Sequence, residues 1–246
     1  MSYLERSNLD IEKTLKGFRF EFSRAAILEE AFKDNLSSYI ADAFSEEPFE
    51  AQGVLVTGPS RAGKTKEIQH LLNEFHAAEV MMPNGKPAKV VTCILKGSVT
   101  WKDLGKKVLT TLGYDLKGNL SQNEIWDRVS IQSELQNVIG IHFDECQHMF
   151  RDTTRNTNEV IIDSFKAVMK DSRYPMMLIL SGVPKLEEFI NAPSVAAEQI
   201  RPLLTSVRFA NIHLPDDEET MVDLLIELCD LGGVGYEKLQ TEDLNP

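Results

Sequence analysis

Short apolar runs alternate along the chain with longer stretches in which apolar residues recur at helical spacing. The apolar runs end at turn-forming residues and have the length of strands, whereas the intervening stretches have the length of helices. Strands are expected at residues 53–57, 89–95, 138–145, 175–180 and 207–214. Helices are expected at residues 64–78, 100–112, 123–137, 160–170 and 194–204, with further helical segments starting at 185 and 215. This alternation predicts an α/β fold in which a parallel sheet carries helices on both faces.

A glycine-rich octapeptide joins the first predicted strand to the first predicted helix. Its spacing is that of a phosphate-binding loop, in which glycines bend the backbone so that successive N–H groups face phosphate oxygens. The following helix directs its positive end at the same anion. Lys64 would contact the β- and γ-phosphates of ATP, and Thr65 would bind Mg²⁺. The nucleotide-binding residues predicted on this basis are Gly58, Pro59, Ser60, Arg61, Ala62, Gly63, Lys64 and Thr65.

Two adjacent carboxylates end the predicted strand at residues 138–145. Asp144 fits the residue that holds the magnesium ion, usually through water, and Glu145 fits the residue that activates a water molecule in line with the γ-phosphate. Taken alone, the octapeptide could be an ordinary strand-to-helix turn, and the carboxylates could be a solvated strand end. Their occurrence together predicts a magnesium-dependent ATPase.

Composition limits the class of protein. The 246 residues, of which 42% are hydrophobic, suffice for one large domain with a substantial core. No apolar run approaches the ~18 residues of a membrane span. The N-terminal residues lack the form of a secretory signal, so a cytoplasmic protein without a membrane partner is expected. The cysteines Cys93, Cys146 and Cys229 lack disulfide-framework or zinc-site spacing and are expected to be reduced.

The net charge of −12 argues against a polyanionic partner such as DNA. The charge is unevenly distributed, however, because residues 51–150 carry a net charge of +1. This middle part of the chain contains a group of lysines, namely Lys96, Lys102, Lys106, Lys107 and Lys117. The sequence therefore allows a small basic face on an acidic protein.

Four segments together resemble the AAA+ ATPases, and most closely the TniB/TnsC group of transposition ATPases with their ExeA-type and initiator-type relatives. They are the octapeptide and residues 144–148, 180–186 and 208–215, and the resemblance covers about residues 19–230. It implies a P-loop NTPase fold of the AAA+ type with a short helical lid. The domains expected are an N-terminal helical extension and linker at 1–50, a nucleotide-binding core at 51–214 and a partial lid at 215–246.

The resemblance also implies roles for individual residues. AAA+ proteins form rings or filaments with ATP between subunits, and an arginine of one subunit completes the neighbour's site. Arg208 matches that arginine best, Arg201 is a second candidate, and either could instead be an ordinary surface residue. Ser181 resembles the polar residue that positions the attacking water, although a serine before glycine also forms turns.

In the transposition ATPases the segment after the second strand lines the DNA-contacting face. The corresponding residues Lys96, Thr100, Lys102 and Lys106 are expected to contact phosphates of double-stranded DNA without sequence preference. Transposase and target-selector proteins would then be partners of an ATP-dependent homo-oligomer. One alternative is a solvated lysine face with Trp101 in the core. Another is an ATP-gated protein-interaction switch, associated with secretion or defence, that does not bind DNA.

The C-terminal part departs from the family pattern. Residues 215–246 contain a single basic residue, Lys238, so they offer no sensor-2 arginine of the kind that many AAA+ lids carry. Residues 241–246 resemble a helix start without a helix, which suggests a truncated lid. Two histidines, His142 and His148, are expected to be hydrogen-bonded structural residues rather than ligands.

Overall fold

The computed structural model describes residues 12–15, 17–45, 47–116, 118–150, 155–212 and 217–232. The chain forms two compact units, one spanning Arg24–Asn211 and the other combining Met1–Ser23 with Ile212–Pro246. The larger unit contains the whole sheet and every site described below. In the smaller unit, helix α9 (Glu218–Gly232) begins within the acidic segment predicted to start a helix at residue 215, and residues 213–216 lie outside the described part of the chain.

Five parallel strands form one sheet in the order β2-β3-β4-β1-β5. The predicted α/β fold with a parallel sheet is confirmed. Strands β1, β3 and β4 occupy the middle and are buried along their whole length, which explains why they read as unbroken apolar runs. The strands are β1 (Gly53–Thr57), β2 (Lys89–Ile94), β3 (Val138–Asp144), β4 (Met177–Gly182) and β5 (Leu204–Arg208).

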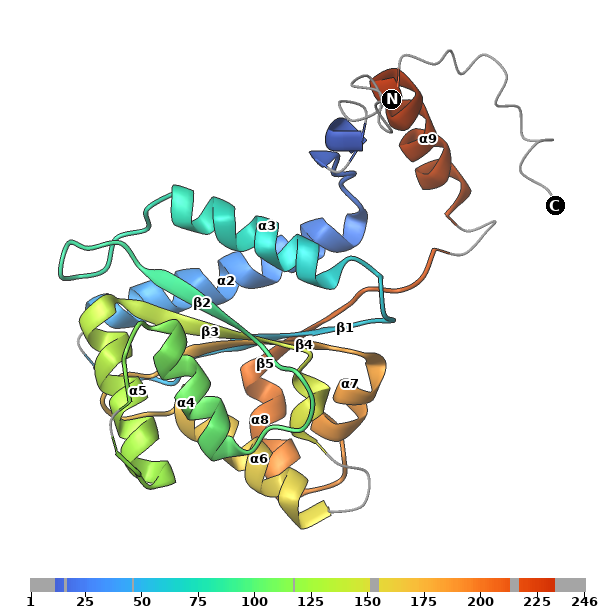
Figure 1. Cartoon of the computed structure of the whole chain (residues 1–246). Coiled ribbons are helices and arrows are strands. Elements are labelled where there is room, and N and C mark those ends of the chain that lie inside the picture. The colour runs from blue at the N-terminus through green and yellow to red at the C-terminus, as the bar shows by residue number, and fades with distance from the viewer. Residues whose placement is uncertain are drawn as a thin grey trace, which may run out of the picture. The chain divides into compact units, whose positions relative to one another are not determined.

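Helices cover both faces of this sheet, and each face has its own hydrophobic core (Figure 1). Helices α2 (Ser23–Ser45) and α3 (Lys64–Ala77) cover one face. The other face carries α4 (Trp101–Thr111), α5 (Gln122–Gln136), α6 (Arg155–Met169), α7 (Pro184–Ile190) and α8 (Val195–Ile200). Because the strands are parallel, their carboxyl ends meet at one edge, where the loops that follow β1, β3 and β4 come together.

Helix α2 is fixed to the sheet by buried side chains. The Asn35 amide donates to the carbonyl oxygen of Gly53 at 2.9 Å, and the Tyr39 hydroxyl donates to that of Pro175 at 2.9 Å. Residues 24–45 therefore belong to the same compact unit as the sheet. The division of the chain after residues 50 and 214 stays a prediction.

Local signals account for several helix starts. Thr100 caps α4 by accepting a hydrogen bond from the backbone N–H of Asp103, and Ser121 with Glu124 forms a capping box at α5. The predicted helix at 194–204 is too long. It ends at Ile200, and a 3₁₀ turn that contains Pro202 leads into β5 at Leu204. Proline has no N–H to continue the helix, so the strand starts earlier than expected.

The strand expected at residues 207–214 ends at Arg208, and His213 and Leu214 lie outside the described residues. Cys93, Cys146 and Cys229 are free, as predicted, and the first two are buried. Within the described ranges, no helix has both the length and the apolar character needed to cross a bilayer.

Candidate nucleotide-binding site

The loop between β1 and α3 has the backbone geometry of an anion cradle. Gly63, at the N-cap of α3, has a φ of 92°, in the left-handed region that glycine adopts without strain. Gly58 lies so close to the chain after β5 that a Cβ at this position would be 2.3 Å from the carbonyl oxygen of Phe209. Both glycines of the octapeptide are therefore required by shape, one for backbone conformation and one for close packing.

Lys64 lies at the first turn of α3 and is only 7% exposed. Its ammonium donates to the carbonyl oxygens of Gly58 and Pro59, both at 2.8 Å, so it folds back over the loop. Burial lowers the pKa of Lys64, while the charges of Glu145 and Asp144 oppose that shift. The adjoining cavity has a volume of about 430 Å³ and is lined by Ser60, Arg61, Gly63, Lys64, Thr65, Lys66 and Glu145.

A hydrogen bond to Asp144 connects the loop between β1 and α3 to the end of β3. The Thr65 hydroxyl donates to Oδ2 of Asp144 at 2.9 Å, although the two residues are 79 positions apart. A hydroxyl oxygen and a carboxylate oxygen at this separation are suitable ligands for Mg²⁺, which prefers oxygen ligands and retains several waters. The two residues predicted to bind magnesium therefore lie together beside the cavity.

A chain of hydrogen bonds runs from Asp144 across three strands. The Ser181 hydroxyl donates to Oδ1 of Asp144 at 2.7 Å, and Nε2 of His142 lies 2.8 Å from that hydroxyl oxygen. Because Ser181 uses its only proton on Asp144, Nε2 of His142 must donate to Ser181. Nδ1 of His142 then accepts from the hydroxyl of Thr92 at 3.3 Å. Burial lowers the pKa of His142 to about 4, which keeps the ring neutral as this chain requires.

Glu145 occupies a constrained position directly after β3. Its φ of 57° is in the left-handed region, which is uncommon for a residue with a side chain. Its carboxylate accepts a hydrogen bond from the amide nitrogen of Gln147. The amide oxygen of Gln147 accepts in turn from the backbone N–H of Val183 at 3.3 Å, in the loop after β4. Gln147 therefore fixes the Glu145 carboxylate relative to the loop that follows Ser181.

The sequence patterns assigned no role to Gln147 or Thr92. Gln147 stands in the segment 144–148, two positions after Glu145, and this spacing is the signal that could have identified it. Thr92 has no comparable signal, because its contact depends on the pairing of β2 with β3. His142 is hydrogen-bonded within the core, as expected for a structural histidine.

Replacing Gln147 by alanine should lower the rate of ATP hydrolysis by about 10-fold without weakening ATP binding, because Glu145 loses its positioning contact. Gln147→Glu should lower the rate further at neutral pH, since a second carboxylate cannot donate to Glu145 and repels it. Single-turnover rates and nucleotide titrations at neutral pH measure these effects, and a matching loss of affinity in Gln147→Ala would contradict them.

Arg201 and Arg208, the arginines predicted to act on a neighbouring subunit, do not line the nucleotide cavity. Arg208, at the end of β5, forms a two-point ion pair with Glu187 of α7, with Nε 3.0 Å from each carboxylate oxygen. This pairing lowers the pKa of Glu187, whose Oε2 also accepts from the Thr57 hydroxyl at 3.2 Å. Arg201 is exposed and donates to the carbonyl oxygen of Ala197 at 3.1 Å.

The predicted DNA-contacting residues lie on the segment from the end of β2 into α4. Lys96 and Lys106 are exposed and Lys102 is half-buried. Lys106 pairs with Asp103 at 3.4 Å, and Thr100 bonds the same carboxylate at 2.6 Å. Trp101 is half-buried, and one face of its ring is stacked on Trp126.

Comparisons with known proteins agree with this geometry. A family model described as an AAA domain matches residues 47–190, which is more than half of the chain. No curated protein matches the chain.

Many solved structures have a similar fold, and three of them serve as examples. The ORC2 protein of Aeropyrum pernix, in ADPNP-ADP complexes, has a TM-score of 0.61 at 12% identity and matches 87% of this chain and 52% of its own. Cdc6p from Pyrobaculum aerophilum has a TM-score of 0.58 at 10% identity, and the match covers 86% of this chain and 51% of Cdc6p. The Aeropyrum pernix ORC1 protein in complex with DNA has a TM-score of 0.51 at 14% identity, covering 83% and 49%. The chain thus spans about half the length of each, and a structural likeness at such low identity shows the fold alone.

Proposed function

The chain belongs to the AAA domain family, and from this premise we propose that it binds and hydrolyses ATP with the aid of Mg²⁺. The observation that carries the proposal is the hydrogen bond between Thr65 and Asp144, at 2.9 Å, beside a cavity that also contains Lys64 and Glu145. This contact supports the proposal because the loop and the end of β3 are far apart in sequence, while Thr65 and Glu145 line the cavity and Asp144 is hydrogen-bonded to Thr65. The ORC2 protein with ADPNP and ADP gives a precedent for nucleotide on the same fold.

Each residue has a distinct part in this reaction. Lys64 neutralises phosphate charge, exchanging its two carbonyl contacts for phosphate oxygens. Thr65 and Asp144 would hold the metal, which would supply charge stabilisation to the phosphates when bound. Glu145 accepts a proton from the attacking water, and Gln147 orients the Glu145 carboxylate. Ser181 acts on this site through Asp144, to which it is hydrogen-bonded.

We assign Arg208, with Arg201 as the second choice, to the site of a neighbouring subunit in an ATP-dependent ring or filament. The support is that neither arginine lines the cavity of its own chain, so both remain available to another. The guanidinium of Arg208 is largely exposed, with a side chain 74% accessible to solvent. Donation to a γ-phosphate would require it to leave Glu187, which in exchange regains a proton more readily.

We further propose that ATP-bound subunits assemble on double-stranded DNA and regulate or recruit a transposase. Lys96, Lys102 and Lys106 would contact phosphates along the exposed segment at the start of α4, with Thr100 at its N-cap. The complex of the ORC1 protein with DNA is a precedent for this fold on duplex DNA. A single subunit with a net charge of −12 would bind weakly, so repeated contacts in an assembly supply the affinity.

Duplex binding should therefore depend on nucleotide, be cooperative in protein concentration and weaken steeply with salt. Lys102→Glu should reduce affinity about 10-fold and lower the salt slope by roughly one to two per subunit in contact. Lys33→Glu is the matched control, because Lys33 is an exposed lysine on α2, on the opposite face of the sheet. Fluorescence anisotropy with a labelled duplex and an ATP analogue measures both variants.

The outcome of that titration also decides between two functions. The net charge of −12 favours an ATP-gated protein-interaction switch that does not bind DNA. Absence of duplex binding at low salt with saturating ATP analogue would support the switch and rule out the role in transposition. Equal losses in Lys102→Glu and Lys33→Glu would show that overall charge, rather than the segment at α4, determines binding.

A further inference from the structure

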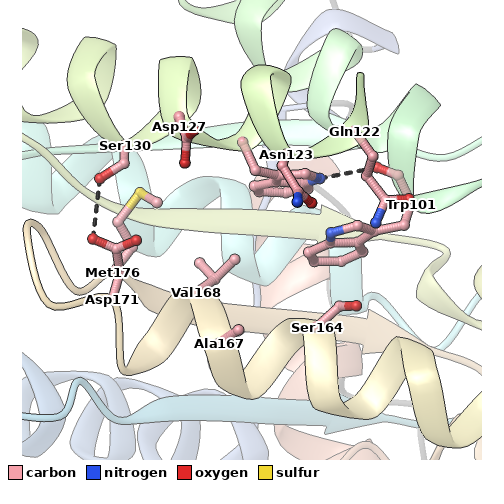
Figure 2. Close-up of a pocket in the computed structure, with 11 residues that line it drawn as sticks. Trp101, Gln122, Asn123, Asp127, Ser130, Ser164, Ala167, Val168, Asp171 and Met176 are labelled. Atoms are coloured by element: carbon pink, nitrogen blue, oxygen red, sulfur yellow. Dashed lines mark hydrogen bonds between the residues drawn. The ribbon is translucent and has the colours of Figure 1, made fainter. Parts of the chain in front are cut away.

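A second cavity lies between α5 and α6, and it shares no lining residue with the nucleotide cavity. Its volume is about 250 Å³. Figure 2 shows Asp127 and Ser130 on α5 facing Ala167 and Val168 on α6, with Trp101 at one end and Asp171 at the other. This α5/α6 groove is smaller than the ~300–1,000 Å³ of typical small-molecule sites, and its size suits one long side chain.

Two stacked indoles form the aromatic part of the groove. The rings of Trp101 and Trp126 lie 4.2 Å apart between centroids and are inclined by 11°. The Trp126 indole N–H donates to the backbone carbonyl oxygen of Trp101 at 3.1 Å, and Trp101 packs edge-on against Phe165. Because these contacts fix both rings, the groove presents a rigid π-surface rather than a mobile side chain.

Two carboxylates make the same groove negative. Asp171 accepts three hydrogen bonds through Oδ1, from the Ser130 hydroxyl and from the backbone N–H groups of Arg173 and Tyr174. These bonds orient the carboxylate, and Oδ2 accepts none within the described part of the chain. The second carboxylate, Asp127, is exposed, and it makes no hydrogen bond or ion pair with another described residue. No lysine or arginine occurs among the residues that line the groove.

We propose that the α5/α6 groove binds an arginine side chain presented by a partner protein. A guanidinium can stack on an indole face while its N–H groups donate to carboxylate oxygens. Asp127 offers both of its oxygens for two parallel bonds, and Asp171 offers Oδ2 for one. The aliphatic stem of the arginine would contact Val168 and Met176, the apolar part of the lining. The carboxylates repel phosphate, so charge selects a cationic protein segment over a nucleic acid.

The groove also connects to the segment proposed to contact DNA. Trp101 is the first residue of α4 and directly precedes Lys102. A partner bound at the groove would therefore contact the residue next to this lysine. This arrangement places the protein partner beside the start of α4, whether or not the segment binds DNA.

The chain contains only two tryptophans, and both line the groove, so intrinsic fluorescence reports on it directly. The probes are the blocked tripeptide acetyl-Ala-Arg-Ala-amide and the same peptide with citrulline, an uncharged isostere of arginine. The arginine peptide should change the emission saturably, with a dissociation constant on the order of 10 mM, which corresponds to about −3 kcal/mol. The citrulline peptide should have little effect.

Two carboxylate variants test the polar half of the groove. Asp127→Asn and Asp171→Asn should each weaken arginine-peptide binding about 5- to 10-fold. Asp163→Asn is the matched control, because Asp163 lies on α6 but outside the groove and pairs with Lys166. Circular dichroism verifies the fold of each variant. An equal response to citrulline, no saturable response, or unchanged affinity in both groove variants would overturn the proposal.

Discussion

Replacing Lys64 by alanine should lower the affinity for ATP by about 100-fold or more while the fold is retained. Lys64 is the buried cation of the loop, with its ammonium held 2.8 Å from the carbonyl oxygens of Gly58 and Pro59. Without it, the phosphates in the cavity lose a desolvated charge partner, a change that costs about 3 kcal/mol or more. Titration with a fluorescent ATP analogue measures the loss.

Lys66→Ala is the control for position. Lys66 lines the same cavity but is exposed, so its removal should change the affinity only a few-fold. Equal losses in the two variants would indicate that the number of positive charges matters rather than the place of Lys64. Wild-type affinity in Lys64→Ala would contradict the assignment of the loop as a phosphate site.

Replacing Glu145 by glutamine should lower the rate of ATP hydrolysis by roughly 100- to 10,000-fold and leave ATP binding nearly unchanged. Glutamine keeps the shape of the side chain and its contact with Gln147, but it cannot accept a proton from water. Asp144→Ala should behave differently and lose the magnesium dependence of binding, because the Thr65 contact and the metal ligand disappear together.

Single-turnover hydrolysis, measured with nucleotide affinity in the same samples, separates these two effects. Glu74→Gln is the control, since Glu74 is exposed on α3 and pairs with His70, away from the cavity lining. Normal turnover by Glu145→Gln would show that another group accepts the proton. A parallel loss of affinity in that variant would show that Glu145 contributes to binding instead.

Local sequence patterns were sufficient to predict the parallel sheet, whereas the roles given to the site residues stay predictions. The strands β1, β3 and β4 are largely apolar because both faces of the sheet are covered. Asp144 is the last residue of β3, Glu145 follows it, and Lys64 begins the helix after β1. Gly58 and Gly63 were predictable for a different reason, because the loop has to turn within a few residues.

The contacts around this site depend on tertiary structure and were not predictable. His142 and Ser181 are 39 residues apart and meet only because β3 lies next to β4. The α5/α6 groove likewise combines residues of separate helices, and no sequence spacing relates Trp101 to Asp171. The predicted boundary between α8 and β5 was wrong because α8 ends at Ile200, before the 3₁₀ turn that contains Pro202.

The hydrogen-bond chain from Thr92 to Asp144 has a consequence for the interpretation of mutants. Each group in it has a fixed donor or acceptor role, so the residues are expected to show epistasis. Ser181→Ala would leave the Nε2 proton of His142 without an acceptor in the core, which costs about 1–3 kcal/mol whether or not the hydroxyl takes part in catalysis. A loss of activity in that variant would therefore combine a folding effect with a chemical one. Only a double substitution, in which His142 also becomes apolar, would separate the two effects.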